Sequence, residues 1–202
     1  MPSPRLVALV SSRFVLFAAA LLAAPVLPAQ DVPPGMELVP RTQLKGNTLA
    51  VPGSGFSVDC PDTSWRWLKS TRPATDSQGR PVPLQTFVCD QPQTHGRLVI
   101  IVHPRDTPAP LTQPEADKLA KDMSAGALRA GARLDAMKCV AVATTPGGFR
   151  CNTTMALPTG EKGYGHFHFL AAAGKDFTLM FGTHSAEDPP QLAAFAKSLK
   201  AF

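Results

Sequence analysis

The sequence predicts an α+β fold, an α/β/α sandwich in which helices cover a central, largely antiparallel sheet. Short apolar segments separated by Gly and Pro follow one another over residues 84–103 and 134–185, which is typical of strands. Residues 112–130 and 188–202 instead carry apolar side chains with a period of about 3.6, which indicates helices. The run from Leu98 to Val102 is apolar at every position, so we expect layers on both faces of the sheet.

Turn residues divide the strand segments. Gly55 to Cys60 is a first expected strand, which Pro61 ends, and residues 70–83, rich in Pro, Gly, Ser and Asp, are an expected loop. Because strands joined by short turns pair antiparallel, a largely antiparallel sheet follows. The further strands are expected at 84–90, 97–103, 134–143, 149–157, 164–172 and 177–185.

Both helices carry start signals. Thr112 and Glu115 have the spacing of a capping box ahead of the first helix. Asp188, the two prolines after it and Gln191 are typical of the start of the second. Leu192, Phe195, Ala196 and Leu199 form the apolar stripe of that helix, with Phe202 at its end.

The first 29 residues have the pattern of a bacterial secretory signal peptide. Arg5 and Arg13 precede an uncharged run from Phe14 to Ala24, and small residues follow up to Ala29. A helix of that run would cover about 16 Å, roughly half of a hydrocarbon core of about 30 Å, so a membrane span is not expected. We expect cleavage near Ala29 and a periplasmic or secreted protein.

The remaining chain is long enough for one domain with a real core. Residues 30–54 are rich in proline and are expected to form an extended N-terminal arm, and residues 55–202 a single domain. Loss of Arg5 and Arg13 lowers the net charge from +5 to +3. The basic residues are spread along the chain, so we expect no nucleic-acid partner.

Four cysteines in an exported chain predict two disulfide bonds, and the absence of a Cys-x-x-Cys motif argues against a metal or redox site. The turn signal around Thr145 to Gly148 favours one pairing. If Val142 faces Gly148 across this hairpin, then Cys139 faces Cys151, at a separation that a disulfide can bridge. Elimination leaves the other pair. The favoured bonds are Cys60–Cys89 and Cys139–Cys151.

The hairpin of residues 164–185 holds the sharpest site candidate. Apolar residues alternate on both strands and are expected to share the core face, which requires paired residue numbers to add to an even sum such as 348 or 350. The opposite face would then hold a candidate copper or zinc site. The alternative is that these are half-buried polar residues. The core set is Phe167, Phe169, Ala171, Phe177, Leu179 and Phe181, and the candidate ligands are His166, His168, Met180 and His184.

Other site candidates carry less chemistry. His103 ends the buried strand and is either a group near a cleft or a strand cap. Trp65 and Trp67 are candidates for stacking on a ligand, with core packing as the alternative. No Gly-x-Ser-x-Gly elbow or His-Glu-x-x-His helix occurs. A possible carboxylate cluster consists of Asp59, Asp62 and Asp90.

Three features of the chain form a recognisable pattern: Gly55-Phe56-Ser57-Val58 with Cys60-Pro61 and Trp65, the strand of residues 175–181, and the closing helix of residues 196–202. In these features the chain resembles the PsbP-like superfamily, over roughly residues 55–202. The resemblance implies an α/β/α sandwich that acts as a binding or accessory module. The four cysteines are not part of the general pattern of that superfamily.

We therefore expect an exported, non-enzymatic binding or accessory domain of the cell envelope, whose partner is an envelope protein or a small ligand, without a cofactor. The alternative is a periplasmic copper- or zinc-binding protein that uses His166, His168 and His184. A second alternative is an enzyme of a type that the motifs do not reveal.

Overall fold

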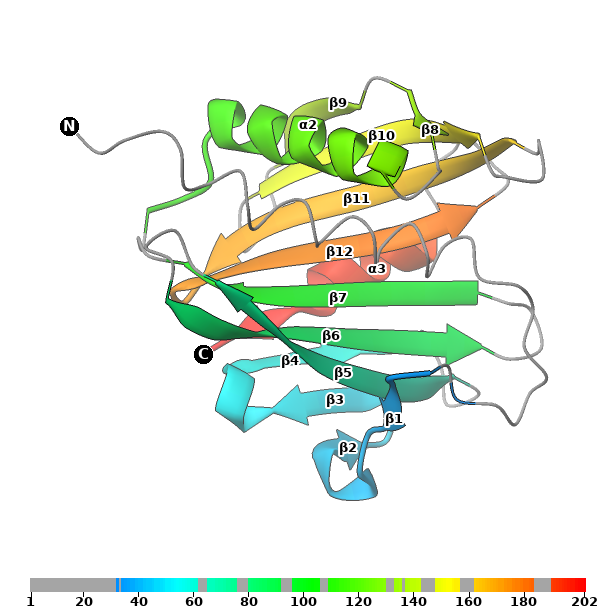
Figure 1. The fold of residues 1–202 in the computed structure, drawn as a ribbon. Helices are drawn as coiled ribbons and strands as arrows, with labels where there is room; N and C mark the ends of the chain where they lie inside the picture. The colour runs from blue at the N-terminus through cyan, green and yellow to red at the C-terminus, as the bar shows by residue number, and fades with distance from the viewer. Residues whose placement is uncertain are drawn as a thin grey trace.

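The computed structural model describes residues 32, 34–61, 65–75, 80–91, 96–105, 109–129, 133–135, 137–142, 148–156, 162–183 and 190–202. Within them the chain forms a nine-stranded sheet, a four-stranded sheet and two α-helices (Figure 1). Neither of these helices combines the length and the apolar character that a bilayer-crossing helix needs.

The large sheet is antiparallel at every pairing. Its strands, in spatial order, are β1 (Glu37–Leu38), β5 (Arg66–Thr75), β6 (Pro81–Gln91), β7 (Gly96–Pro104), β12 (Lys175–Thr183), β11 (Lys162–Ala172), β10 (Gly148–Ala156) and β8 (Arg133–Leu134), with β9 (Lys138–Val142) also paired to β10.

The small sheet joins the two ends of the described chain. Its strands, in order, are β13 (Lys200–Ala201), β4 (Phe56–Asp59), β3 (Thr48–Val51) and β2 (Leu44–Lys45). The helices are α2 (Gln113–Arg129) and α3 (Pro190–Ser198), and two short 3₁₀ helices are η1 (Arg41–Gln43) and η2 (Pro52–Ser54).

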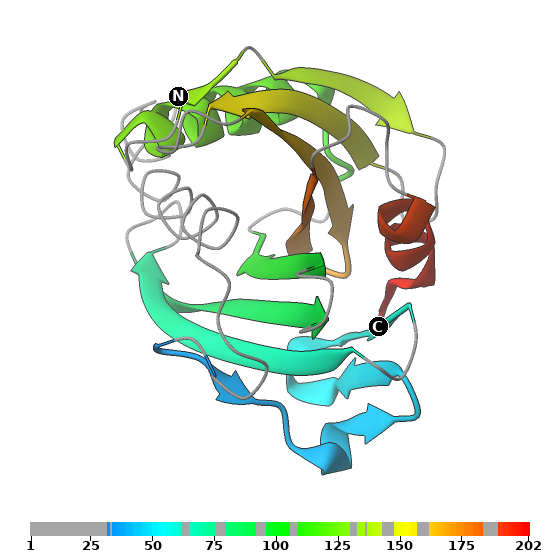
Figure 2. The ribbon, with the colours of Figure 1, turned by 90° about the vertical axis from the view of Figure 1, so that its right-hand side faces the viewer.

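The predicted α/β/α sandwich is wrong, because the fold is mostly antiparallel β-sheet. α2 packs along the β8–β10 end of the large sheet, whereas α3 lies on the other side together with the small sheet (Figure 2). Residues 44–51 fold as strands and bury Leu49 and Val51, so they do not form the expected arm. A second sheet thus supplies much of a layer that we expected to be helical.

Two cores lie on opposite faces of the large sheet, which we call the α2 face and the α3 face. β7 contributes to both: Leu98, Ile100 and Val102 are buried on the α3 face, and Val99 and Ile101 on the α2 face. The expectation of a strand buried on both sides is confirmed. Each such side chain stabilises the fold by about 2 kcal/mol relative to an exposed one.

The loop predicted for residues 70–83 is wrong in its described parts, since residues 70–75 belong to β5 and residues 81–83 to β6. Pro73 and Pro83 lie opposite each other in this pair of strands. A proline cannot donate a ladder hydrogen bond and is tolerated only where one edge is unpaired. That condition holds here, because β1 pairs only with Leu68 and Lys69 on β5, and the pairing of β6 with β7 begins at Gln85.

The β9–β10 hairpin has the predicted register. Val142 lies opposite Gly148, and Cys139 lies opposite Cys151 with a Cα–Cα distance of 4.2 Å. This short distance is typical of a non-hydrogen-bonded antiparallel pair. The structure also pairs Cys60 with Cys89, at a Cα–Cα distance of 6.4 Å. Both cysteine pairs are thus joined as the sequence favours.

The predicted register of the β11–β12 hairpin is wrong. Ala172 pairs with Lys175, so paired residue numbers add to an odd sum. The cause is the two-residue turn, in which Ala173 has φ of 48° and Gly174 has φ of 69°, the backbone of a type I′ turn. The sheet has a core on each face, so both strands carry apolar residues on both sides. The apolar pattern therefore did not determine which residues of β11 lie on the same face as which residues of β12.

The Cys139–Cys151 bond closes a loop with a sequence separation of 12. We expect the double substitution Cys139→Ala with Cys151→Ala to lower the free energy of unfolding by about 3 kcal/mol, because the unfolded chain gains freedom. Urea denaturation without reductant measures the change. Reduction of the wild type should lower its stability at least as much, and equal stability of variant and wild type would contradict the role of this bond.

Ala173 holds a left-handed backbone that a side chain disfavours. Ala173→Asn creates an Asn-Gly type I′ turn and should stabilise the protein by about 1 kcal/mol. Thermal unfolding followed by circular dichroism measures this. Ala173→Val is the matched control and should lower the melting temperature. If both substitutions shifted the melting temperature in the same direction, the described turn would be contradicted.

Candidate functional site

The register of β11 and β12 divides the predicted metal ligands. His166 and His168 point to the α3 face, where they lie opposite Phe181 and Leu179. Met180 lies opposite Phe167 in the core of the α2 face, so it cannot join the two histidines. His184 is outside the described residues. The predicted ligand set is therefore wrong as a unit, and no group of three or more His, Cys, Asp or Glu side chains is gathered for a metal in the described part of the chain.

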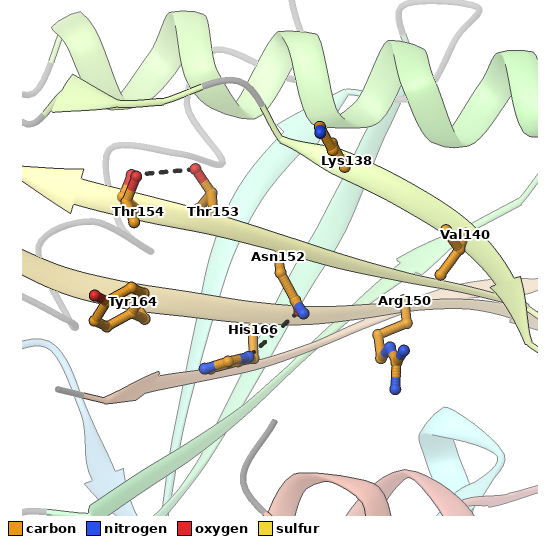
Figure 3. Close-up of a pocket in the computed structure, with 8 residues that line it drawn as sticks. All are labelled: Lys138, Val140, Arg150, Asn152, Thr153, Thr154, Tyr164 and His166. Atoms are coloured by element: carbon orange, nitrogen blue, oxygen red, sulfur yellow. Dashed lines mark hydrogen bonds between the residues drawn. The ribbon is translucent and has the colours of Figure 1, made fainter. Parts of the chain in front are cut away.

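A groove opens on the α3 face at the end of the sheet formed by β9, β10 and β11 (Figure 3). Its volume is about 440 Å³, within the usual range of about 300–1,000 Å³ for small-molecule sites. The described residues that line it are Lys138, Val140, Arg150, Asn152, Thr153, Thr154, Tyr164 and His166.

Strand register explains why these side chains meet. Lys138, Asn152, His166 and Phe181 occupy facing positions on four neighbouring strands, from β9 to β12. Alternation places all four on the α3 face. At one end of this row of four residues, Phe181 packs against the apolar core, whereas the three residues toward β9 are polar. α3 contacts β4 and β12, so the polar end of the row lies beyond the strand against which the helix packs.

The groove offers positive charge and hydrogen-bond donors. Lys138 is exposed and Arg150 is half-buried, and both project from the strands that form the wall (Figure 3). His166 is 1% exposed, and its Nδ1 lies 3.3 Å from Oδ1 of Asn152. No carboxylate belongs to the lining that the structure describes. The two cationic side chains repel a further cation, which makes this a poor cation site.

Alternation along β10 is a signal in the sequence for this groove. Arg150, Asn152 and Thr154 alternate with buried residues along one strand, which marks a polar face. The confirmed hairpin register places Lys138 beside them, opposite Asn152. The sequence did not show which side chains of β11 share this face with those of β12, because that depends on the turn between the two strands.

The two tryptophans pack in the core of the α3 face. Trp67 is 3% exposed and stacks on Phe195 of α3, with ring centroids 6.0 Å apart. Trp65 is half-buried and packs against the same core. The prediction that Trp67 stacks on a ligand is therefore wrong, because α3 covers that ring.

The predicted carboxylate cluster is not assembled among the described residues. Asp59 is exposed and accepts a hydrogen bond from Thr48. Asp90 is buried between two arginines, Arg66 at 2.9 Å and Arg97 at 3.0 Å, on the flanking strands. Asp62 lies outside the described residues. Asp90 thus serves to hold β5, β6 and β7 together.

His103 lies opposite Asp176 beside an ion-pair cluster at the start of α2. Arg105 is 3.0 Å from Asp176 on β12 and 3.0 Å from Glu115 on α2, so it ties the helix to the sheet. Burial raises the pKa of Asp176, against the opposing effect of Arg105. For Glu115 the effect of burial is outweighed by hydrogen bonds from Thr112 and by Arg105, which lower its pKa. These contacts assign the cluster a structural role.

Comparison with known proteins identifies no family. No protein-family model matches the chain, and no curated protein matches it. One solved structure, from Bacteroides thetaiotaomicron, is 15% identical in sequence with a TM-score of 0.47, over 79% of this chain and 49% of the other. This chain thus spans about half the length of that one. A likeness of this degree carries no argument about function.

The lowered pKa of Glu115 predicts a pH-dependent contribution to stability. Since the folded pKa lies below 4.5, ionised Glu115 stabilises the protein above about pH 4.5, and the effect is lost as the pH falls through the folded pKa. Glu115→Gln should therefore be less stable than the wild type at neutral pH and approach it in acid. Urea denaturation at several pH values measures the difference. A difference between the variant and the wild type that does not vary with pH would contradict the prediction.

Proposed function

We propose that the protein is an exported, non-enzymatic binding domain of the cell envelope that holds a small polar ligand in the groove between β9 and β11. The groove itself is the observation that carries the proposal. It gathers charged and hydrogen-bonding side chains from three strands, beside a core that is otherwise filled with apolar residues. A concave site with a few convergent polar groups is the usual form of a small-molecule site.

The groove chemistry supports binding rather than bond-making. A nucleophile needs a neighbouring base that activates it. The described lining contains neither a carboxylate nor a thiol, and its histidine is buried against Asn152. All four cysteines are joined in disulfide bonds, so none acts as a nucleophile in this state.

Rigid walls further support a binding role. The Cys139–Cys151 bond joins β9 to β10, the two strands that supply Lys138 and Arg150. A site that is already in its binding shape loses little conformational entropy when the ligand arrives. The bond thus stabilises the wall as well as the fold.

Export is supported by two observations. Disulfide bonds persist in oxidising compartments such as the periplasm, and the chain has two. The charged and apolar pattern of residues 1–29, which lie outside the described residues, matches a signal peptide. We do not propose the copper or zinc alternative, because His166 and His168 are buried opposite apolar residues of β12 and no group of three or more candidate ligands is found among the described residues.

The test is a thermal-shift screen of polar metabolites that includes anions, cations and neutral sugars. We expect at least one class to raise the melting temperature of the wild type. Asn152→Trp fills the groove and should abolish the shift, whereas Lys121→Trp, on an exposed position of α2, should preserve it. No stabilising compound, or an equal response of Asn152→Trp and wild type, would overturn the proposal.

A further inference from the structure

We infer that the Cys139–Cys151 bond is a redox switch in the wall of the groove. A small dithiol reduces this bond before the Cys60–Cys89 bond, and β9 then opens from β10 more readily while the rest of the fold stays intact. The effect of this opening on ligand binding rests on the proposed function, whereas the opening itself does not. The inference follows from the exposure of the two bonds and from the contacts that hold β9.

The two disulfide bonds differ in their access to solvent. Cys139 is half-buried and lies on β9, which in the described part of the chain pairs with β10 alone. Cys60 and Cys89 are 2% and 0% exposed and lie in the core of the α3 face. A reductant opens a disulfide when a thiolate attacks one of its sulfurs, so the rate depends on access to that sulfur. The Cys139–Cys151 bond should therefore react first, while the protein is still folded.

The exchange is balanced between the protein and the dithiol. One thiolate of the reductant attacks Sγ of Cys139, because Cys151 is fully buried, and Cys151 leaves as a thiolate that takes up a proton. The second thiolate of the reductant then breaks the mixed disulfide and releases Cys139, which is protonated in turn. The protein gains two electrons and two protons, and the dithiol becomes a disulfide.

The surroundings of the bond accommodate both thiols. Sγ of Cys139 lies 3.9 Å from the carbonyl oxygen of Ala116 on α2, so a thiol formed there can donate a hydrogen bond. Cys151 belongs to the core of the α2 face, where a thiol packs as a small apolar group. Reduction therefore leaves no buried charge that would disturb α2 or the core.

The bond ties a short edge strand to the large sheet. β9 has five residues, all of them paired with β10. On its other side it contacts α2, where Nε2 of Gln113 donates to the carbonyl oxygen of Cys139 at 3.3 Å. Short strands at the edge of a sheet open locally at low cost, and a covalent link to the neighbouring strand opposes this. Loss of the link should therefore increase the opening of β9 more than that of central strands.

Opening of β9 changes the groove, because this strand supplies part of its wall. Lys138 and Val140 line the groove from β9 (Figure 3). Arg150 and Asn152 line it from β10, which stays in the sheet through its pairing with β11. A wall that moves loses the shape that favours binding. With a ligand in the groove as proposed, the oxidised protein binds it more tightly than the protein reduced at this bond.

The experiment is stepwise reduction of the full mature protein with increasing concentrations of dithiothreitol. Free thiols are alkylated in urea with N-ethylmaleimide and located by peptide mass spectrometry. We expect Cys139 and Cys151 to be alkylated at concentrations of dithiothreitol that leave Cys60 and Cys89 joined. Reduction of the Cys60–Cys89 bond first, or of both bonds at the same concentration, would overturn the inference.

Hydrogen exchange of the Val140 amide measures the opening of β9. Val140 and Arg150 are the next pair along the ladder from the disulfide and exchange backbone hydrogen bonds, because such pairs alternate with non-hydrogen-bonded ones. After selective reduction the exchange rate at Val140 should rise at least about tenfold, while that of Ile100 on β7 stays unchanged. Unchanged exchange at Val140, or an equal rise at Ile100, would also contradict the inference.

The double variant Cys139→Ala with Cys151→Ala removes the bond without a reductant and should show the same rise in exchange at Val140. Failure of this variant to fold would count against the inference, because the rest of the fold is expected to survive loss of the bond. None of these measurements uses a ligand. A screen in which no compound stabilises the oxidised protein therefore overturns the proposed function alone.

Discussion

Burial of β7 on both faces is the constraint on which the rest of the structure depends. Its five central residues are apolar, and none of them is more than 4% exposed. A strand of this kind is stable only if something covers each side of it. The chain meets this condition with two unlike covers, α2 on one face and α3 with the small sheet on the other. The groove lies where the second cover ends.

The sequence predicted the elements with local signals and failed where distant contacts decide. The capping pair is present as predicted, since Glu115 accepts a hydrogen bond from the backbone N–H of Thr112 at 2.8 Å. Both helices and the β9–β10 hairpin follow from such signals. The small sheet does not, because its strands β13 and β4 are separated by most of the sequence, so no local pattern predicts their pairing. Nothing local at residues 200–202 distinguishes a strand from the end of a helix.

The candidate site shows the same limit in finer detail. Predicting the histidine face required the register of β11 and β12, and that register follows from the backbone of Ala173 and Gly174. A hairpin that is apolar on one side only would have revealed its register by alternation. Here both sides are buried, so alternation was compatible with two registers one residue apart. The part of the groove formed by β9 and β10 depends only on the register of that hairpin, which the sequence predicted correctly.

The place of β13 in the small sheet has a consequence for the order of folding. Lys200 and Ala201 pair with Ser57 and Phe56, so the edge of the small sheet joins segments that lie far apart in the sequence. Contacts between such distant segments form slowly, because a long stretch of chain must first be closed into a loop. We therefore expect β4 to gain its β13 neighbour late in folding, so that the layer on the α3 face is completed after the hairpins of the large sheet.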